Sequence, residues 1–307
     1  MVIAVVLALL SACAFAVSTV VQHRATGSVP GASGRSAVLR IAARLVRHPG
    51  WLFGQAAAAA GFVLHASALR HGQVILVQPL LSSGLVLSLV LGAIVDRTHP
   101  GRPLPNRGQW ASAGVVVVGL SLFLVAAQPH GGRPDAPTDR VLLAAGVALG
   151  LAALAGVYVR RPHRGHRALV AGLAAGIGFG VVGTLLKDVV GTLPGSLWHS
   201  WVPLLVVAVG ATSIVMGQTA YRCGTLIESL PALTVLEPVV AIALARPLYG
   251  ERLAPGLLAH TGQVLGLLLL SAGVVVLARR SARRTATAPV PLPEQQLPDA
   301  RPHSDAA

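Results

Sequence analysis

The chain has 307 residues, of which 54% are hydrophobic and only 11% are charged, and its mean hydropathy is +0.71. A soluble protein of this size could not bury so much apolar surface, so we expect a helical protein that crosses a membrane several times. The formal net charge of +14 does not indicate a nucleic-acid partner, because the arginines lie between apolar runs and not in one basic domain.

Nine segments of the sequence are suited to crossing a bilayer. A hydrocarbon core about 30 Å thick requires roughly 20 predominantly apolar residues per helix. The segments that meet this requirement are 1–21, 51–69, 72–95, 110–127, 140–159, 168–190, 199–221, 224–247 and 257–278. We therefore predict an all-α polytopic membrane protein with nine transmembrane helices.

The flanking segments differ from the spans in composition. Residues 22–50 place arginines at helical spacing among apolar residues, which predicts an amphipathic helix on the inner membrane surface. Residues 279–307 are predicted to form a disordered cytoplasmic tail, because most of this segment is polar and rich in proline.

The distribution of arginine predicts the orientation. The first, third and fifth loops carry five, three and four arginines, and four more follow the last span. Basic loops stay in the cytoplasm, so we expect a multi-pass protein of the cell membrane with its N-terminus outside and its C-terminus inside. Membrane lipids are then its surrounding partners.

A repeated phrase connects the two parts of the chain. "ASALRHGQVILVQP" (66–79) and "QTAYRCGTLIESLP" (218–231) share four residues at a common displacement of 152 positions, and each copy lies where one span ends and the next begins. The pairs Asp96–Arg97 and Glu251–Arg252 close the following spans. Repeat one would cover 1–127, a linker helix 140–159, and repeat two 168–278. Because five spans separate equivalent helices, the halves must point in opposite directions, which predicts an inverted 4+1+4 repeat typical of secondary transporters.

These features resemble the drug/metabolite transporter superfamily, of the EamA-like kind. Its halves share a Gly-then-Pro helix pair that ends near an acidic residue, and "PVVAIALARPLYGERL" (238–253) is similar to the usual ending of its second half. "VQPLLSSGLVLSLVLGAIVDR" (77–97) and "GVVGTLLKDVV" (180–190) are similar to the NIPA-type magnesium transporter branch. The resemblance implies transport of a small solute and makes magnesium a candidate substrate.

Glu237 is the first candidate for the transport pathway. It lies near the middle of the eighth predicted span and precedes Pro238, which cannot donate a hydrogen bond to the Thr234 carbonyl. Thr234 and Glu237 are three residues apart and share a helix face. A carboxylate beside a freed carbonyl suits a cation or a proton, while a structural kink is the alternative interpretation.

Other polar residues in the spans are secondary candidates. A charge at the centre of a membrane helix costs roughly 2.5–3.5 kcal/mol on insertion scales, so such residues usually have a function or a partner. Lys187 could instead extend to the interface, and His65 could be a packed histidine. The further pathway candidates are Lys187, Glu228, Gln78, Gln218 and His65, and the predicted helix breaks are Pro79, Pro231 and Pro238.

The leading hypothesis is a secondary transporter that moves a small solute or ion by alternating access. Transport of a divalent cation such as magnesium is one alternative, and a membrane scaffold or lipid-handling protein is another. The sequence contains no P-loop or soluble-enzyme motif, so we expect no enzymatic activity and no cofactor. The substrate, the direction of transport, proton coupling, any metal site and a homodimeric state are left open.

Overall fold

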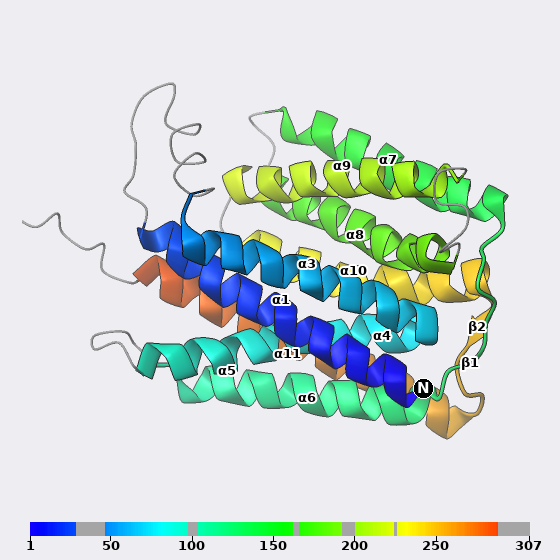
Figure 1. Ribbon diagram of the computed structural model, residues 1–307, viewed down its shortest axis with the longest axis horizontal. Helices are drawn as coiled ribbons and strands as arrows, with labels where there is room; N and C mark the ends of the chain where they lie inside the picture. The colour runs from blue at the N-terminus through cyan, green and yellow to red at the C-terminus, as the bar shows by residue number, and fades with distance from the viewer. Residues whose placement is uncertain (29–46, 98–103, 162–165, 192–199, 224–225, 288–307) are drawn as a thin grey trace, which may run out of the picture.

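The computed structural model describes residues 1–28, 47–97, 104–161, 166–191, 200–223 and 226–287. Within these residues, nine helical spans are long and apolar enough to cross a membrane, and they run along the long axis of the molecule (Figure 1). The chain is therefore an all-α polytopic membrane protein, as the sequence predicts. The elements are α1 (Val2–Ser28), α3 (Pro49–His71), α4 (Val74–Leu81), α5 (Ser83–Arg97), α6 (Arg107–Ala127), β1 (His130–Gly131), α7 (Thr138–Val159), α8 (Arg167–Gly191), α9 (Val202–Cys223), α10 (Leu226–Tyr249), β2 (Glu251–Arg252) and α11 (Leu257–Thr287).

The two ends of the helix bundle differ. One end holds the two short strands and the beginning of α1, and we call it the outer end after the predicted orientation (Figure 1). The opposite end, where α1, α5 and α11 finish, is called the inner end. The predicted surface helix at 22–50 falls mostly outside the described residues. The predicted disordered tail at 279–307 is wrong at its start, because α11 continues to Thr287 through alanines and arginines, which are good helix formers.

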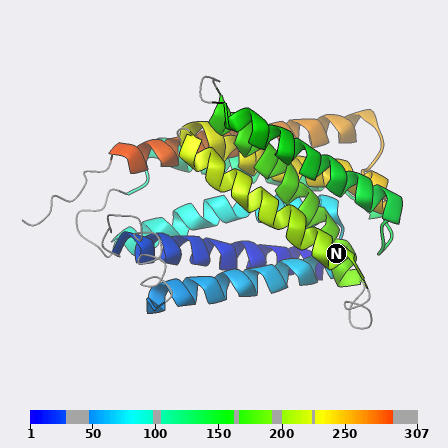
Figure 2. The same ribbon diagram turned by 90° about the horizontal axis from the view of Figure 1, so that it is seen from above.

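Helix α8 occupies the centre of the bundle. In its most apolar window 67% of the residues are buried, whereas the other spans have 28–39%. The outer helices expose large apolar side chains such as Val125, Leu204 and Leu258, at 71%, 74% and 87%. Such exposure is expected where a helix faces lipid tails. Figure 2 shows α8 beside α9 and α10 on one side of the molecule, with α1 and α3 on the other.

Glycines in α8 allow its neighbours to approach closely. A Cβ atom at Gly176 would lie 2.8 Å from the Leu233 carbonyl oxygen, and one at Gly180 would lie 2.7 Å from the Glu237 carbonyl oxygen. Gly178 faces α9, where an added Cβ would meet the Ser213 side chain. Small residues at these positions let the backbones pack directly, which is a common way to join helices in lipid. The contact also fixes the position of Glu237 relative to α8.

The first helices of the two halves have similar neighbours. In the first half α1 packs against α3 and against α4 and α5, and in the second half α8 packs against α9 and α10. Helices α6 and α11, which are equivalent in the repeat, pack against each other. Gly273 in the middle of α11 faces Val116 in the middle of α6, and Gly262 near the start of α11 faces Ala126 near the end of α6. These two helices therefore run in opposite directions.

Only one of the three predicted helix breaks is present. The third span is divided at Ser82, where α4 ends and α5 begins, three residues after Pro79. Helix α10, in contrast, is continuous from Leu226 to Tyr249 through Pro231 and Pro238. A proline removes one helical hydrogen bond, and a membrane helix tolerates this loss when neighbouring groups compensate it.

We predict that the inner end is cytoplasmic. Single cysteines introduced at Ser28 and Thr285, in a chain whose native Cys13 and Cys223 are replaced by serine, should react with impermeant reagents only from the cytoplasmic side. A cysteine at Thr138 should react only from outside. Labelling of positions 28 and 138 from the same side would contradict this topology, because the three spans between them, α3, α4–α5 and α6, place the two positions on opposite sides.

Candidate functional site

A small cavity lies between α4–α5 and α10, close to the middle of the spans. Its volume is about 120 Å³, and its polar lining comes from Gln78, Ser82, Thr234 and Glu237. Gln78 and Ser82 belong to the first half of the chain, and Thr234 and Glu237 belong to the second. A water molecule occupies about 30 Å³ of liquid, so the cavity has room for a small group such as an ammonium or a hydrated ion. The structure thus brings together three of the residues predicted from sequence.

Of the described residues that line this cavity, Glu237 is the only ionisable one. Its side chain is partly exposed, and within the described residues no hydrogen bond or ion pair to its carboxylate is found. A carboxylate in a membrane interior is costly without a partner. The cavity must therefore supply the missing interaction from water, a proton or a bound cationic group.

Gln78 lines the cavity, and His65 lies behind it in contact with its side chain. Gln78 is 2% exposed, and its Nε2 atom lies 3.4 Å from Nε2 of His65 on α3. On the other side, a Cβ atom at Gly183 of α8 would lie 2.5 Å from the same amide nitrogen. Helices α3, α4 and α8 therefore meet at Gln78. His65 supports Gln78 and is not among the residues that line the cavity.

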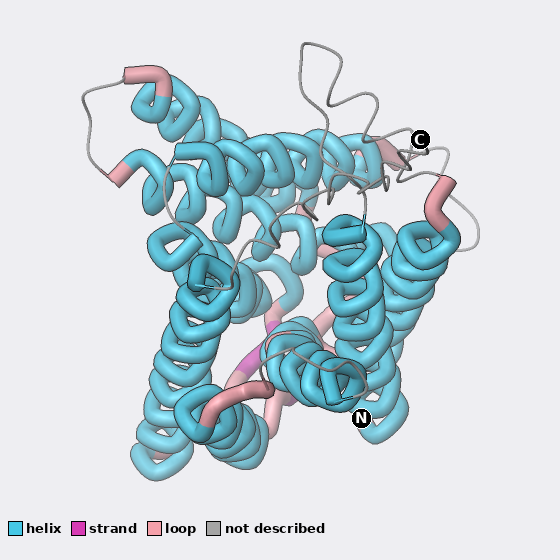
Figure 3. Tube along the Cα trace, turned by 90° about the vertical axis from the view of Figure 1, so that its left-hand side faces the viewer, coloured by secondary structure: helices cyan, strands magenta, loops and turns pink. Residues whose placement is uncertain are grey.

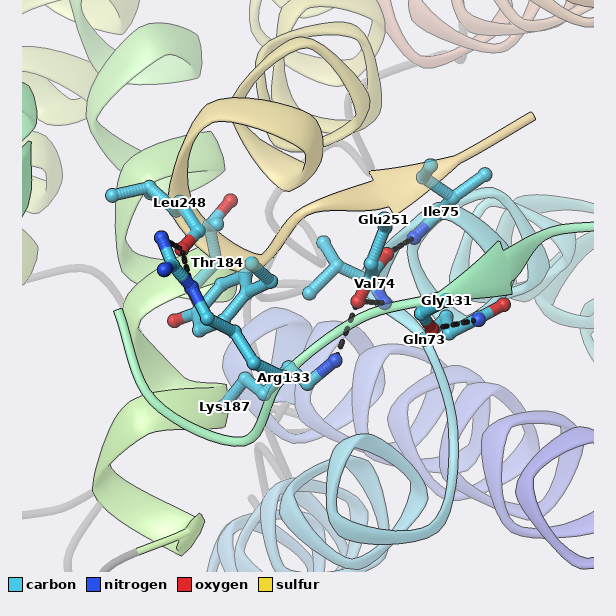
Figure 4. A network of polar contacts seen from close by, with 10 residues as sticks. Gln73, Val74, Ile75, Gly131, Arg133, Thr184, Lys187, Leu248 and Glu251 are labelled. Atoms are coloured by element: carbon cyan, nitrogen blue, oxygen red, sulfur yellow. Dashed lines mark hydrogen bonds and ion pairs between the residues drawn. The ribbon is translucent and has the colours of Figure 1, made fainter. Parts of the chain in front are cut away.

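A buried carboxylate, Glu251, seals the outer end. It is 0% exposed and lies just after α10, in strand β2. Its Oε1 atom accepts a hydrogen bond from the Val74 amide at 2.9 Å and its Oε2 atom accepts one from the Ile75 amide at 3.0 Å (Figure 4). These amides are the first two of α4 and have no partner within their own helix. Glu251 therefore caps a helix of the other half.

Lys187 completes this seal. Its Nζ atom lies 2.5 Å from Oε1 of Glu251 and 4.9 Å from the centre of the Tyr249 ring. The Tyr249 hydroxyl donates to the Thr184 carbonyl at 2.9 Å, one helical turn before Lys187 on α8. Lys187 thus neutralises Glu251 and lies at the outer end. Lys187 was predicted as a pathway residue that could also reach the interface; in the structure it lies at the outer end of α8, where its partner is Glu251 and not Glu237.

Two strands and their flanking loops cover the seal. Strands β1 and β2 pair antiparallel, with Gly131 opposite Glu251. The Gln73 amide donates to the Gly131 carbonyl at 2.7 Å. The Arg133 guanidinium donates to the Leu248 carbonyl through Nε at 3.1 Å and Nη2 at 2.9 Å (Figure 4). The segment between α6 and α7 is thereby fastened over the ends of α4 and α10.

The inner end is held less tightly. Helix α4 packs against α10, but among the described residues α5 packs against α1, α4 and α6 and not closely against α10. Residues 81–92 are all partly exposed, so no face of this stretch is fully covered. The ion pair here, Arg24 to Asp96 at 2.8 Å, has side chains that are 23% and 21% exposed. Figure 3 shows the bundle from this end.

Three other predicted residues have different outcomes. Gln218 is exposed on α9 and is not among the described residues that line the cavity, so the structure does not bring it together with Glu237. Gln218 lies near the inner end of its helix, where an amide can reach the polar interface. The side chains of Glu228 and Pro231 are outside the described part of the structure. Glu251 was visible in the sequence only as part of an acidic–arginine pair that marks the repeat.

We predict that breaking the buried Lys187–Glu251 pair destabilises the fold far more than breaking the partly exposed Arg24–Asp96 pair at the inner end. Lys187→Met leaves the Glu251 carboxylate buried without its counter-charge, which should lower the free energy of unfolding by about 3–5 kcal/mol. Arg24→Met is the matched control and should cost about 0–1 kcal/mol, because its pair is partly exposed. Unfolding in detergent measures both values. The double variant Lys187→Met/Glu251→Gln should cost less than the sum of the single changes, and strict additivity would contradict a direct interaction.

Comparison with known proteins gives one relative and no fold precedent. No family model matches the chain, and no solved structure matches it. The chain is 31% identical over 292 residues to an uncharacterised protein of Corynebacterium glutamicum, and the alignment covers 91% of this chain and 96% of that protein. At this identity and coverage, the chain belongs to the same protein family as the Corynebacterium protein.

Proposed function

We propose that the protein is a secondary transporter of the cell membrane, of the drug/metabolite transporter type, which moves a small solute by alternating access between its two halves. The state described above has a closed outer end and a looser inner end. In this proposal a solute reaches the cavity at Glu237 from the cytoplasmic side, and the outer seal must open to release it or to admit it.

The carboxylate of Glu237 is the observation that carries the proposal. It stands at the boundary between the halves, beside a cavity, within a helix that is fixed by the glycines of α8. Ionisable groups at this depth typically mark substrate or ion pathways in membrane proteins. A scaffold would have no need for a carboxylate at this position, where the described part of the chain gives it no partner.

Transport of magnesium is supported less well. Magnesium prefers several oxygen ligands in a near-octahedral arrangement and keeps some of its water. The cavity offers one carboxylate, and among the described residues no three His, Cys, Asp or Glu side chains come together. A solute with an ammonium or another hydrogen-bond donor fits the carboxylate, the Gln78 amide and the Thr234 hydroxyl better.

Glu237→Gln should abolish uptake by the reconstituted protein while leaving its folding intact. The amide has the same shape but no charge, so it cannot neutralise a cationic group or carry a proton. Proteoliposomes are first screened with amino acids, other small zwitterions and divalent cations, and the variant is then measured with the solute that is transported. Asp139→Asn, which removes an exposed carboxylate at the start of α7, is the control and should transport normally. Unchanged uptake by the Glu237→Gln protein would show that Glu237 has only a structural role.

The repeat suggests which groups close the inner end in the opposite state. A displacement of 152 residues carries Val74 and Ile75, which Glu251 caps, onto Leu226 and Ile227. Leu226 is the first residue of α10, just as Val74 is the first residue of α4. The two helices therefore begin at equivalent positions, one at the outer end and one at the inner end.

Asp96 is the equivalent of Glu251 at the inner end. Each carboxylate lies at the end of the helix that leads from the cavity, is followed by arginine, and pairs with a basic residue on the first helix of its own half. These basic residues are Arg24 on α1 and Lys187 on α8. In the inward-closed state we therefore propose that Asp96 caps the amides of Leu226 and Ile227, while Glu251 releases Val74 and Ile75.

Removal of the two carboxylates should shift the protein in opposite directions. A single cysteine at Ser82, which lines the cavity, reports access from each side of the membrane in right-side-out and inside-out vesicles. Glu251→Gln should increase labelling from outside and decrease labelling from inside, because it weakens the outer seal. Asp96→Asn should do the reverse. A shift in the same direction for both variants would contradict the exchange of seals.

A further inference from the structure

We propose that a basic pocket at the outer end binds the anionic group, carboxylate or phosphate, of a small solute. Its role as an entry or exit site rests on the proposed transport function, whereas the binding itself does not. The pocket has a volume of about 410 Å³ and is separate from the cavity at Glu237. It lies over the outer seal, between the end of α3, the start of α4 and the segment that follows β1.

The charge of this pocket is strongly unbalanced. Among the described residues, its lining contains Arg70, His71, Arg133 and Lys187 and no aspartate or glutamate. Glu251, which is not among the lining residues, pairs with Lys187 and neutralises its charge. Among the described residues, Arg70 and Arg133 have no carboxylate partner, since Arg133 donates only to the Leu248 carbonyl. Like charges gathered in one concave surface repel one another unless an anion is bound between them.

The position of these arginines is also unexpected for the topology. Arginine is normally depleted on the outer side of a membrane protein, because basic loops remain in the cytoplasm. Here Arg70 and Arg133 belong to two different outer connections and yet line the same pocket. Arg70 is also part of the repeated phrase, and its equivalent Arg222 is exposed at the inner end. Each mouth of the proposed pathway therefore has an arginine at the same place in its half.

Lys187 connects this pocket to the outer seal. The same side chain lines the pocket and pairs with Glu251. An anion in the pocket therefore competes with Glu251 for the ammonium group of Lys187, and it weakens the seal when it binds. A solute that carries both charges has a partner at each step, since its anionic end fits the basic pocket and its ammonium fits Glu237. The inferred substrate class is a small zwitterion.

The test measures the local potential with charged thiol reagents and needs no transport. A single cysteine is placed at Gln73, which lines the pocket, in the full-length protein without Cys13 and Cys223. A cysteine at Leu257, exposed at the start of α11, is the reference. The ratio of reaction rates for an anionic and a cationic methanethiosulfonate should be about 10-fold higher at position 73 than at position 257. Arg70→Gln should reduce this ratio several-fold.

Competition identifies the anionic group. Inorganic phosphate and acetate, added separately at constant ionic strength, should slow the anionic reagent at position 73 and leave position 257 unchanged. The more effective anion shows whether a phosphate or a carboxylate is preferred. His71→Cys serves as a second reporter in case the Gln73 hydrogen bond to Gly131 is needed for folding. Equal ratios at the pocket and reference positions, or no effect of Arg70→Gln and of both anions, would overturn the proposal even if the protein proves to be a transporter.

Discussion

The outer seal depends on one buried carboxylate that joins both halves of the chain. Glu251 is fully buried, and its hydrogen bonds to Val74 and Ile75 connect residues that are 177 and 176 positions apart. When α4 moves away, Glu251 loses two donors at once, and two helix amides lose their acceptor. An unsatisfied buried group costs more than a hydrogen bond contributes when it forms. The proposed opening of the outer end would therefore have to break this whole contact at once.

The rest of the fold divides into a rigid part and a part that can bend. Gly176 and Gly180 let α8 contact the backbone of α10 directly, so these helices form one body that carries Lys187, Glu237 and Glu251. The third span lacks such continuity, because α4 and α5 meet at Ser82 beside the cavity. We interpret this junction as the hinge between the sealed outer part of the span and its looser inner part. The polar groups of the cavity thus lie where the bending occurs.

Much of the fold follows from the sequence because the bilayer fixes the length of each apolar run. The nine spans were predicted to within a few residues, and the polar residues Gln78, Thr234 and Glu237 were expected to face inward because lipid excludes them. Glu251 was missed as a functional group because it lies beyond the end of its span. Its burial arises from loops that are distant in sequence, and no local pattern predicts it. Gln218 was grouped with these residues but does not lie with them, because polarity near a helix end does not show whether a side chain faces the core or the interface.

The charges along the proposed pathway distinguish between the candidate solutes. A divalent cation entering from the outer side would meet Arg70, His71 and Arg133 before it reached Glu237, and one entering from the inner side would meet Arg222 near that mouth. Basic mouths lower the local concentration of cations and raise that of anions. A purely anionic solute would in turn be repelled by Glu237. A zwitterion satisfies both regions, because its two charged ends can interact with groups of opposite sign, one after the other, as it crosses the membrane.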